Sequence, residues 1–137
     1  MFRNEFPMLG KKIHGNPFTY FDSAATALKP QDVINSISDF YAHDYATVNR
    51  GVYTSCKEAT DTYYNVRKEV ADFVGANHAE EIIFTGGTTA SLNLLAKLLF
   101  QNCLKEGDEI ILSEMEHDAN IVPWQIEAKL KKVQIKV

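Results

Sequence analysis

The sequence has few of the features that identify secreted, membrane or nucleic-acid-binding proteins. Its 137 residues include two cysteines, Cys56 and Cys103, too few for a disulfide scaffold, so a cytoplasmic location is expected. No run reaches the roughly 20 apolar residues of a transmembrane helix, and the first residues are too polar for a signal peptide. The 14 Lys and Arg residues, against 18 Asp and Glu, form no cluster. We therefore expect neither a membrane nor a nucleic-acid partner.

The usual fingerprints of phosphate and metal sites are also missing. The sequence contains neither G-x-x-x-x-G-K-[ST] nor G-x-G-x-x-G. Its histidines do not have partners at the spacing of common metal sites, and no metal is predicted.

One stretch nevertheless has the form of an anion-binding site. A short apolar run at 82–84, expected to be a strand, is followed by Thr85-Gly86-Gly87 and by a helix that begins at Thr88 and Thr89. Glycines allow close approach of the backbone to a ligand, and a helix N-terminus favours negative charge. The threonine hydroxyls could cap the helix or donate to a phosphate. A plain capped helix after a strand is the alternative.

A second candidate segment follows the strand expected at 109–113. His117 lies here among acidic neighbours, Glu114, Glu116 and Asp118. Three interpretations stay open: a metal ligand, a solvated surface histidine, or an imidazole that stacks on an aromatic ligand bearing a phosphate. Both candidate segments follow strands, which is where parallel α/β sheets bind their ligands.

From residue 81 onward, predicted strands and helices alternate as β-α-β-α-β, which is typical of a parallel α/β sheet. The last helix is expected to run to about Lys132 with Ile126 and Leu130 inward, and the last strand to occupy 133–137. Cys103 is expected to be a buried small hydrophobe.

The first half of the chain is predicted to be an arm followed by helices. Residues 1–17 read as an irregular arm with one short turn and 18–21 as a brief strand, and helices are expected at 30–43 and 55–74. A capping box is predicted at 55–58 and a Gly75 stop at the end of the second helix. The loop between the helices carries Asn49 and Arg50. The predicted domains are 1–75 and 76–137.

Four motifs resemble one family of enzymes. These are Y-F-D-S-A-A at 20–25, N-R-G-V-Y at 49–53, F-T-G-G-T-T at 84–89 and M-E-H-D-A-N-I-V-P-W at 115–124. Together they are similar to the group II (SufS/CsdA-like) cysteine desulfurases, which are class V aminotransferase-like enzymes of fold type I that use pyridoxal 5′-phosphate. The resemblance covers nearly the whole chain.

The resemblance assigns roles to individual residues. Thr88 and Thr89 match threonines that hold the cofactor phosphate, and His117 matches the histidine that stacks on the pyridine ring. Arg50 matches an arginine at the substrate entrance, near the dimer interface. Asn49 stands where close relatives usually have histidine, and Gly86 and Ala90 replace residues that are usually charged.

The resemblance also implies an activity and partners. It implies that the chain is an incomplete fold-type I domain. The enzyme would convert L-cysteine to alanine and an enzyme persulfide for iron–sulfur cluster assembly. The full-length enzyme would be a homodimer and would pass sulfur to an acceptor protein. The Schiff-base lysine and the nucleophilic cysteine of the family lie beyond residue 137, so no catalytic residue is expected in this chain. The alternatives are a selenocysteine lyase or another class V lyase, or a noncatalytic remnant or interaction module.

Overall fold

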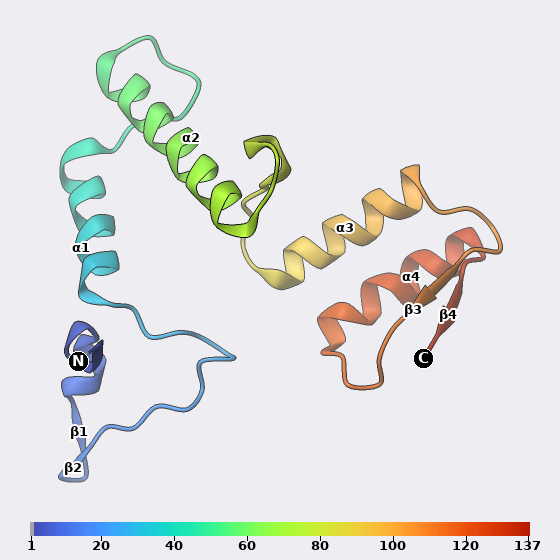
Figure 1. The fold of residues 1–137 in the computed structure, drawn as a ribbon, viewed down its shortest axis with the longest axis horizontal. Coiled ribbons are helices and arrows are strands. Elements are labelled where there is room, and N and C mark those ends of the chain that lie inside the picture. The colour runs from blue at the N-terminus through green and yellow to red at the C-terminus, as the bar shows by residue number, and fades with distance from the viewer. Residues whose placement is uncertain (1) are drawn as a thin grey trace. The chain divides into compact units, whose positions relative to one another are not determined.

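The computed structural model describes residues 2–137. The chain divides into two compact units, one ending at Ile82 and the other running from Ile83 to Val137, and each is described by itself (Figure 1). Within the described range, no helix has the length and apolar character needed to cross a bilayer.

The first unit begins with an ordered arm. Two 3₁₀ helices, Phe2–Glu5 and Pro7–Gly10, are followed by a hairpin of β1, Lys12–Ile13, and β2, Asn16–Pro17. The two turn residues, His14 and Gly15, have φ values of 50° and 81°. Positive φ at both central positions is the requirement of a type I′ hairpin turn. The arm was predicted to be irregular apart from one short turn; the turn is present, but the two 3₁₀ helices and the hairpin closed by the His-Gly pair make the rest more regular than predicted.

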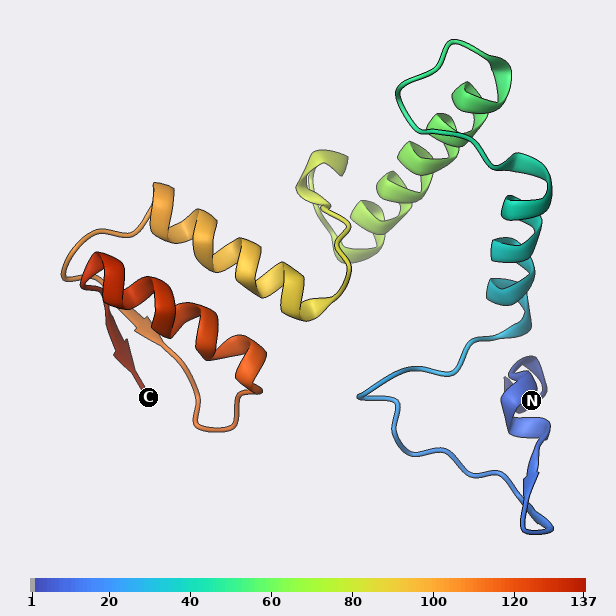
Figure 2. The same cartoon turned by 180° about the vertical axis from the view of Figure 1, so that it is seen from behind.

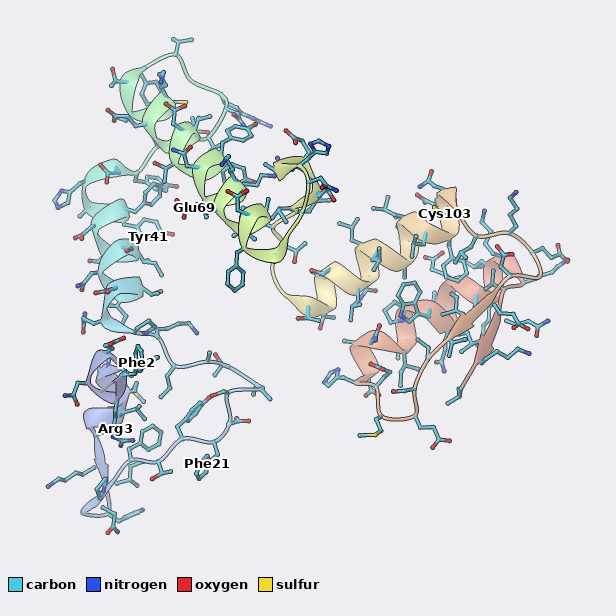
Figure 3. The ribbon with its side chains drawn as sticks, viewed as in Figure 1. Phe2, Arg3, Phe21, Tyr41, Glu69 and Cys103 are labelled. Atoms are coloured by element: carbon cyan, nitrogen blue, oxygen red, sulfur yellow. The ribbon has the colours of Figure 1, made fainter. Side chains whose placement is uncertain are left out.

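The strand predicted at 18–21 was also wrong. The backbone N–H of Phe18 extends the hairpin by donating to the Lys11 carbonyl at 3.0 Å. The Phe18 carbonyl then accepts from the Arg3 guanidinium at 2.8 Å, in place of a neighbouring strand. Figure 3 shows Phe21 projecting from the loop that follows, and its side chain is 95% exposed. Residues 18–21 therefore form no strand, although their apolar side chains predicted one.

Two longer helices and a 3₁₀ turn, Ala79–Glu81, complete the first unit. Helix α1, Gln31–Asp39, passes into a π-helical turn, Phe40–Asp44, so the predicted helix is confirmed although its last turn is wider than an α-helix. Helix α2, Thr54–Val74, ends at Gly75, which has the expected left-handed conformation with φ of 74°. The capping box was wrong, because α2 begins at Thr54 and places Ser55 inside the helix rather than before it.

The second unit alternates helices and strands. Its elements are α3, Thr88–Asn102, β3, Glu109–Ile111, α4, Val122–Lys131, and β4, Gln134–Lys136, with a 3₁₀ turn at Asp118–Asn120. Strands β3 and β4 are parallel, with Ile110 opposite Ile135. The two helices run in the same direction beside each other in both views (Figures 1 and 2). This confirms the predicted α/β class with a parallel sheet.

A small core joins the helices of the second unit to its strands. Its buried side chains are Ala96, Phe100, Trp124, Ala128 and Val133. Phe100 is fully buried, and its ring centroid lies 6.5 Å from that of Trp124. The alanines on the facing helices allow close approach around this aromatic pair.

Three predictions for the second unit need correction. The segment 82–84 does not form the predicted strand, and the Ile82 carbonyl accepts a hydrogen bond from Arg67 Nε at 2.8 Å. Ile126 and Leu130 are exposed, since α4 packs through Trp124 and Ala128. Cys103 is also exposed and lies past the end of α3 (Figure 3).

Candidate functional site

The turn before α3 is closed by side-chain hydrogen bonds. Thr85 Oγ1 lies 2.6 Å from Ser91 Oγ, and each of these oxygens lies 3.2 Å from the Gly87 carbonyl oxygen, so the two hydroxyl protons are shared among three contacts. Gly87 itself has a φ of 146°, in the region that favours glycine. The two hydroxyls thus fix the backbone from which α3 starts. The sequence predicted no separate role for Thr85 and did not single out Ser91. The signal for Ser91 was a hydroxyl residue four positions after the second glycine, Gly87.

The first turn of α3 remains open to a ligand. Gly87 is the N-cap residue and no side chain caps the helix, so of the two roles considered for the threonine hydroxyls, the structure does not show capping. Within residues 2–137, the hydroxyls of Thr88 and Thr89 have no hydrogen-bond partner, and both residues are exposed. Uncapped N–H groups and free hydroxyls at a helix N-terminus form a set of donors that suits a phosphate. These residues therefore suit the phosphate of pyridoxal 5′-phosphate, the cofactor that the motif resemblance implies.

His117 lies in the loop between β3 and α4, at the N-cap of the 3₁₀ turn. Its Nδ1 accepts a hydrogen bond from the Ala119 backbone N–H at 3.1 Å. This bond requires a lone pair on Nδ1, so the neutral ring carries its proton on Nε2. The imidazole is exposed and is oriented by its own backbone.

The His117 loop is braced by a chain of side-chain hydrogen bonds. The Glu116 carboxylate accepts from Ser113 Oγ and from Asn120 Nδ2, both at 2.9 Å. Asn120 Oδ1 in turn accepts from the indole Nε1 of Trp124 at 2.9 Å. The loop is therefore tied to the core through Trp124. These hydrogen bonds were not predicted from the sequence, although Glu116, Asn120 and Trp124 follow each other at intervals of four, which is the spacing of one helical face.

Among the acidic residues of the His117 loop, Glu116 has a pKa that its hydrogen bonds lower. Hydrogen bonds from Asn120, and to a smaller extent from Ser113, hold the pKa of Glu116 below its ordinary value of about 4.5. Hydrogen bonds to the carboxylate stabilise its charged form. Glu116 therefore keeps its negative charge as the bracing group of the loop, and its two oxygens are already engaged with protein donors. Among the described residues, no group of three His, Cys, Asp or Glu side chains is placed to hold a metal ion.

The two candidate segments belong to the same unit. Helix α3 contacts the 3₁₀ turn Asp118–Asn120 next to His117. The N-terminal ends of α3 and α4 lie side by side, at the end of the unit toward which β3 runs (Figures 1 and 2). The donors of Thr88 and Thr89 and the ring of His117 are thus carried by neighbouring elements.

Asn49 and Arg50 belong to the first unit. Asn49 has a φ of 66°, and its side-chain amide donates to the Tyr64 hydroxyl at 3.3 Å. Arg50 is exposed, and no hydrogen bond or ion pair engages its guanidinium within the described range.

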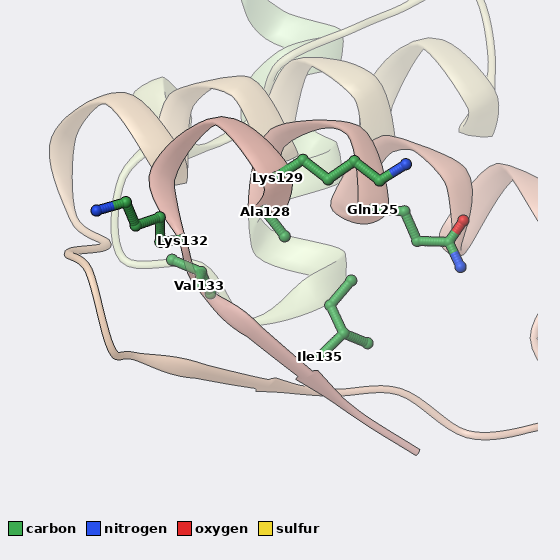
Figure 4. A pocket seen from close by; sticks show the side chains of 6 residues that line it. All are labelled: Gln125, Ala128, Lys129, Lys132, Val133 and Ile135. Atoms are coloured by element: carbon green, nitrogen blue, oxygen red, sulfur yellow. The ribbon is translucent and has the colours of Figure 1, made fainter.

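An open hollow in the second unit lies away from the predicted residues. It has a volume of about 550 Å³ and is formed by α4 and β4 (Figure 4). Its lining consists of Gln125, Ala128, Lys129, Lys132, Val133 and Ile135. None of the predicted site residues takes part in it, so the candidate site is defined by its donors and not by this hollow.

Comparisons with known proteins identify the family. The family model described as aminotransferase class-V matches residues 19–137, so the chain belongs to this family. The match begins before α1 and extends through both candidate segments.

The curated relatives are named cysteine desulfurases. One from Serratia proteamaculans is 50% identical over 135 residues, which is 98% of this chain and 33% of the relative. One from Salmonella dublin is 47% identical with the same coverage. The chain therefore spans about a third of the length of the curated relatives it matches.

Solved structures of cysteine desulfurases have the same fold. The apo enzyme from Thermococcus onnurineus NA1 matches with a TM-score of 0.85 and 37% identity, over 98% of this chain and 32% of that enzyme. CsdA from Escherichia coli matches with a TM-score of 0.73 and 34% identity, over 98% of this chain and 33% of CsdA.

The role of Asn120 can be tested by titration of Glu116. Replacing Asn120 with alanine removes the stronger of the two hydrogen bonds, so the pKa of Glu116 should rise toward its ordinary value; Ser113→Ala should raise it by less. Carboxyl-carbon NMR of Glu116 across acidic pH measures the change. A folded-state pKa below the unfolded value stabilises the fold above the unfolded pKa, and this contribution is lost as pH falls through the folded pKa. In Asn120→Ala that acid-induced loss should shrink.

The control for this titration is Asn102→Ala. Asn102 lies on α3 and its side chain donates to the Leu98 carbonyl, so its removal should leave the Glu116 titration unchanged. An equal shift in both variants, or none in Asn120→Ala, would contradict the assignment.

Proposed function

We propose that the protein to which this chain belongs is a pyridoxal-phosphate-dependent cysteine desulfurase. The reaction converts L-cysteine and a protein thiol to L-alanine and a protein persulfide, so that one sulfur atom moves from substrate carbon to thiol sulfur. The observation that carries the proposal is the 50% identity to a cysteine desulfurase over 98% of the chain. The donors at the start of α3 support it, because they suit the phosphate of the cofactor.

In this proposal the residues of the second unit bind and orient the cofactor. Pyridoxal phosphate supplies an electron sink to the reaction when it is bound. Thr88 and Thr89, with the first-turn N–H groups of α3, hold its phosphate. His117 lies against the pyridine ring, and Nε2 is the nitrogen from which its imidazole donates a proton. Residues 76–137 then form the first part of the cofactor-binding domain, and 1–75 the arm and helices that precede it.

The remaining roles concern substrate and partners. Asn49 and Arg50 stand at the substrate entrance, and the full protein works as a cytoplasmic homodimer that passes sulfur to an acceptor protein for iron–sulfur cluster assembly. The lysine and cysteine of the covalent steps belong to the rest of the protein. These roles rest on the resemblance of the motifs at 49–53, 84–89 and 115–124.

The activity is tested with the full-length protein and two substrates. With L-cysteine and a reducing thiol, we expect stoichiometric alanine and sulfide, measured by amino-acid analysis and sulfide detection. Release of selenide from L-selenocysteine, with no turnover of L-cysteine, would support a selenocysteine lyase instead. Turnover of neither substrate by the cofactor-loaded protein would leave another class V lyase or a noncatalytic module.

Thr89→Val in the full-length protein should weaken retention of the cofactor. The exchange keeps the shape of the side chain and removes one hydrogen bond to a charged group, which costs about 1.5–3 kcal/mol, or roughly ten- to a hundred-fold in affinity. Equilibrium dialysis with cofactor absorbance gives the dissociation constant. Thr62→Val on the exposed surface of α2 is the matched control and should retain cofactor like the wild type. An unchanged dissociation constant for Thr89→Val would remove this hydroxyl from the phosphate site.

His117→Ala should lower turnover and alter the absorption spectrum of the bound cofactor. Loss of a proton-transferring group costs about 100-fold or more in rate. His117→Phe is the matched variant, because it keeps a flat ring and cannot move a proton. We expect a spectrum close to wild type but low turnover in His117→Phe, measured by stopped-flow absorbance and alanine release. Wild-type kinetics in the alanine variant would exclude His117 from the site.

A further inference from the structure

We infer that Glu116 and Asn120 are positioning residues for His117, and that the hydrogen bond between their side chains fixes the imidazole with its proton on Nε2. All the residues involved lie within the second unit. The consequence for the reaction rests on the proposed function, whereas the placement of the imidazole follows from contacts of this chain alone.

The side chains of Glu116 and Asn120 form a bridge over the segment that carries His117. Asn120 Nδ2 donates to Glu116 Oε2 at 2.9 Å, and both residues are half-buried. Beneath this bridge, the backbone N–H of Asn120 donates to the His117 carbonyl at 2.7 Å. The three residues 117–119 are thus enclosed between two hydrogen bonds, one between side chains and one between backbone groups. The ends of the segment separate only when both bonds break.

The bridge is anchored at both of its ends. Glu116 Oε1 accepts from Ser113 Oγ at 2.9 Å, and Ser113 follows β3. Asn120 Oδ1 accepts from Trp124 Nε1 at 2.9 Å, and Trp124 belongs to the buried core. An indole N–H only donates and a carboxylate only accepts, so one orientation of the Asn120 amide satisfies both partners. The bridge therefore has a single hydrogen-bonded arrangement.

The charge of Glu116 strengthens this arrangement. Its hydrogen bonds from Asn120 and Ser113 hold the pKa of Glu116 below the ordinary value, so the carboxylate stays ionised. Hydrogen bonds to an ionised acceptor are about twice as strong as those between neutral groups. The bridge is therefore stronger than an ordinary contact between two polar side chains.

The enclosed segment in turn orients the imidazole. The Ala119 N–H donates to His117 Nδ1 at 3.1 Å, which requires a lone pair on Nδ1. Ala119 is half-buried beneath the bridge, while the His117 ring is exposed. Without the bridge, this N–H is no longer held beside the ring, and the two neutral tautomers of an exposed imidazole interconvert. Glu116 and Asn120 therefore determine which ring nitrogen carries the proton, although neither contacts the imidazole.

The first test measures the tautomer of His117 in the full-length protein, with and without pyridoxal phosphate. Nitrogen-15 NMR of labelled histidine, at alkaline pH where the ring is neutral, distinguishes protonated from unprotonated ring nitrogens. The His117 signals are those that His117→Phe removes. Wild type should show the Nε2–H tautomer, and Asn120→Ala a mixture of the two. Asn102→Ala, whose side chain bonds only within α3, is the control and should match wild type.

A donor–acceptor exchange separates the bridge from a general effect on folding. Asn120→Asp keeps the acceptor for Trp124 but sets a carboxylate against Glu116, so it should give a tautomer mixture like Asn120→Ala. Adding Glu116→Gln to Asn120→Asp reverses the bridge, since the new amide donates to the new carboxylate and still accepts from Ser113. This double variant should restore the Nε2–H tautomer. Thermal unfolding establishes that each variant is folded.

The second test follows the reaction. Asn120→Ala should lower kcat for L-cysteine about tenfold, with a smaller effect on KM, because a misplaced proton-transferring group reduces the rate. In a His117→Phe background the same exchange should have little further effect on kcat, since the group that it positions is gone. The exchange pair Glu116→Gln with Asn120→Asp should recover most of the wild-type kcat.

The outcomes distinguish this inference from the proposed function. An unchanged His117 tautomer in Asn120→Ala and Asn120→Asp, or additive effects of Asn120→Ala and His117→Phe on kcat, would overturn the positioning role while L-cysteine turnover stands. Absence of L-cysteine turnover in the wild-type protein would overturn the proposed function, whereas a tautomer mixture that the exchange pair reverses would still establish the bridge as the device that positions His117.

Discussion

The contact of Phe100 with Trp124 is the interaction on which the second unit depends. Phe100 is fully buried on α3, and Trp124 begins the buried face of α4. Burying two aromatic side chains contributes several kcal/mol, at about 25 cal/mol per Å² of apolar surface removed from water. The indole N–H of Trp124 also bonds to Asn120. One side chain thus joins the apolar core to the polar loop that carries His117.

The candidate site combines rigid supports with free donors. The hydroxyls of Thr85 and Ser91 are used within the turn before α3, and the carboxylate of Glu116 is used within the loop before α4. In contrast, the hydroxyls of Thr88 and Thr89 make no hydrogen bond to the described residues. This division is what a binding site requires, because the supporting groups restrict motion while the ligand-binding groups keep their hydrogen-bonding capacity.

Periodicity in the sequence was sufficient to predict the helices and the parallel class of the sheet. Gly75 ends α2 because glycine readily adopts the left-handed conformation found there. Pro123 lies in the first turn of α4, where its missing N–H leaves no helix hydrogen bond unmade. The errors came from contacts that local sequence does not encode. Residues 82–84 have strand propensity, but a strand also needs a neighbour to accept its hydrogen bonds.

The same distinction applies to side-chain burial. On α4, Ile126 is apolar yet exposed, because tertiary packing selected the face with Trp124 and Ala128. At the candidate site, motif resemblance was sufficient to single out Thr88, Thr89 and His117. The resemblance did not reveal the supporting hydroxyl of Ser91, because its role depends on a side-chain rotamer and on the turn that the fold brings against the start of α3.

The parallel pairing of β3 with β4 has a consequence for the order of events in folding. Parallel strands cannot be joined by a tight turn, so the chain between them must fold back before they pair. Here that intervening chain contains α4 and the His117 loop. Closing this long loop costs entropy, which is repaid only when the strands and the core are in place. Pairing of β3 with β4 therefore requires the intervening chain to have folded back, and the His117 loop lies within the segment that this pairing closes.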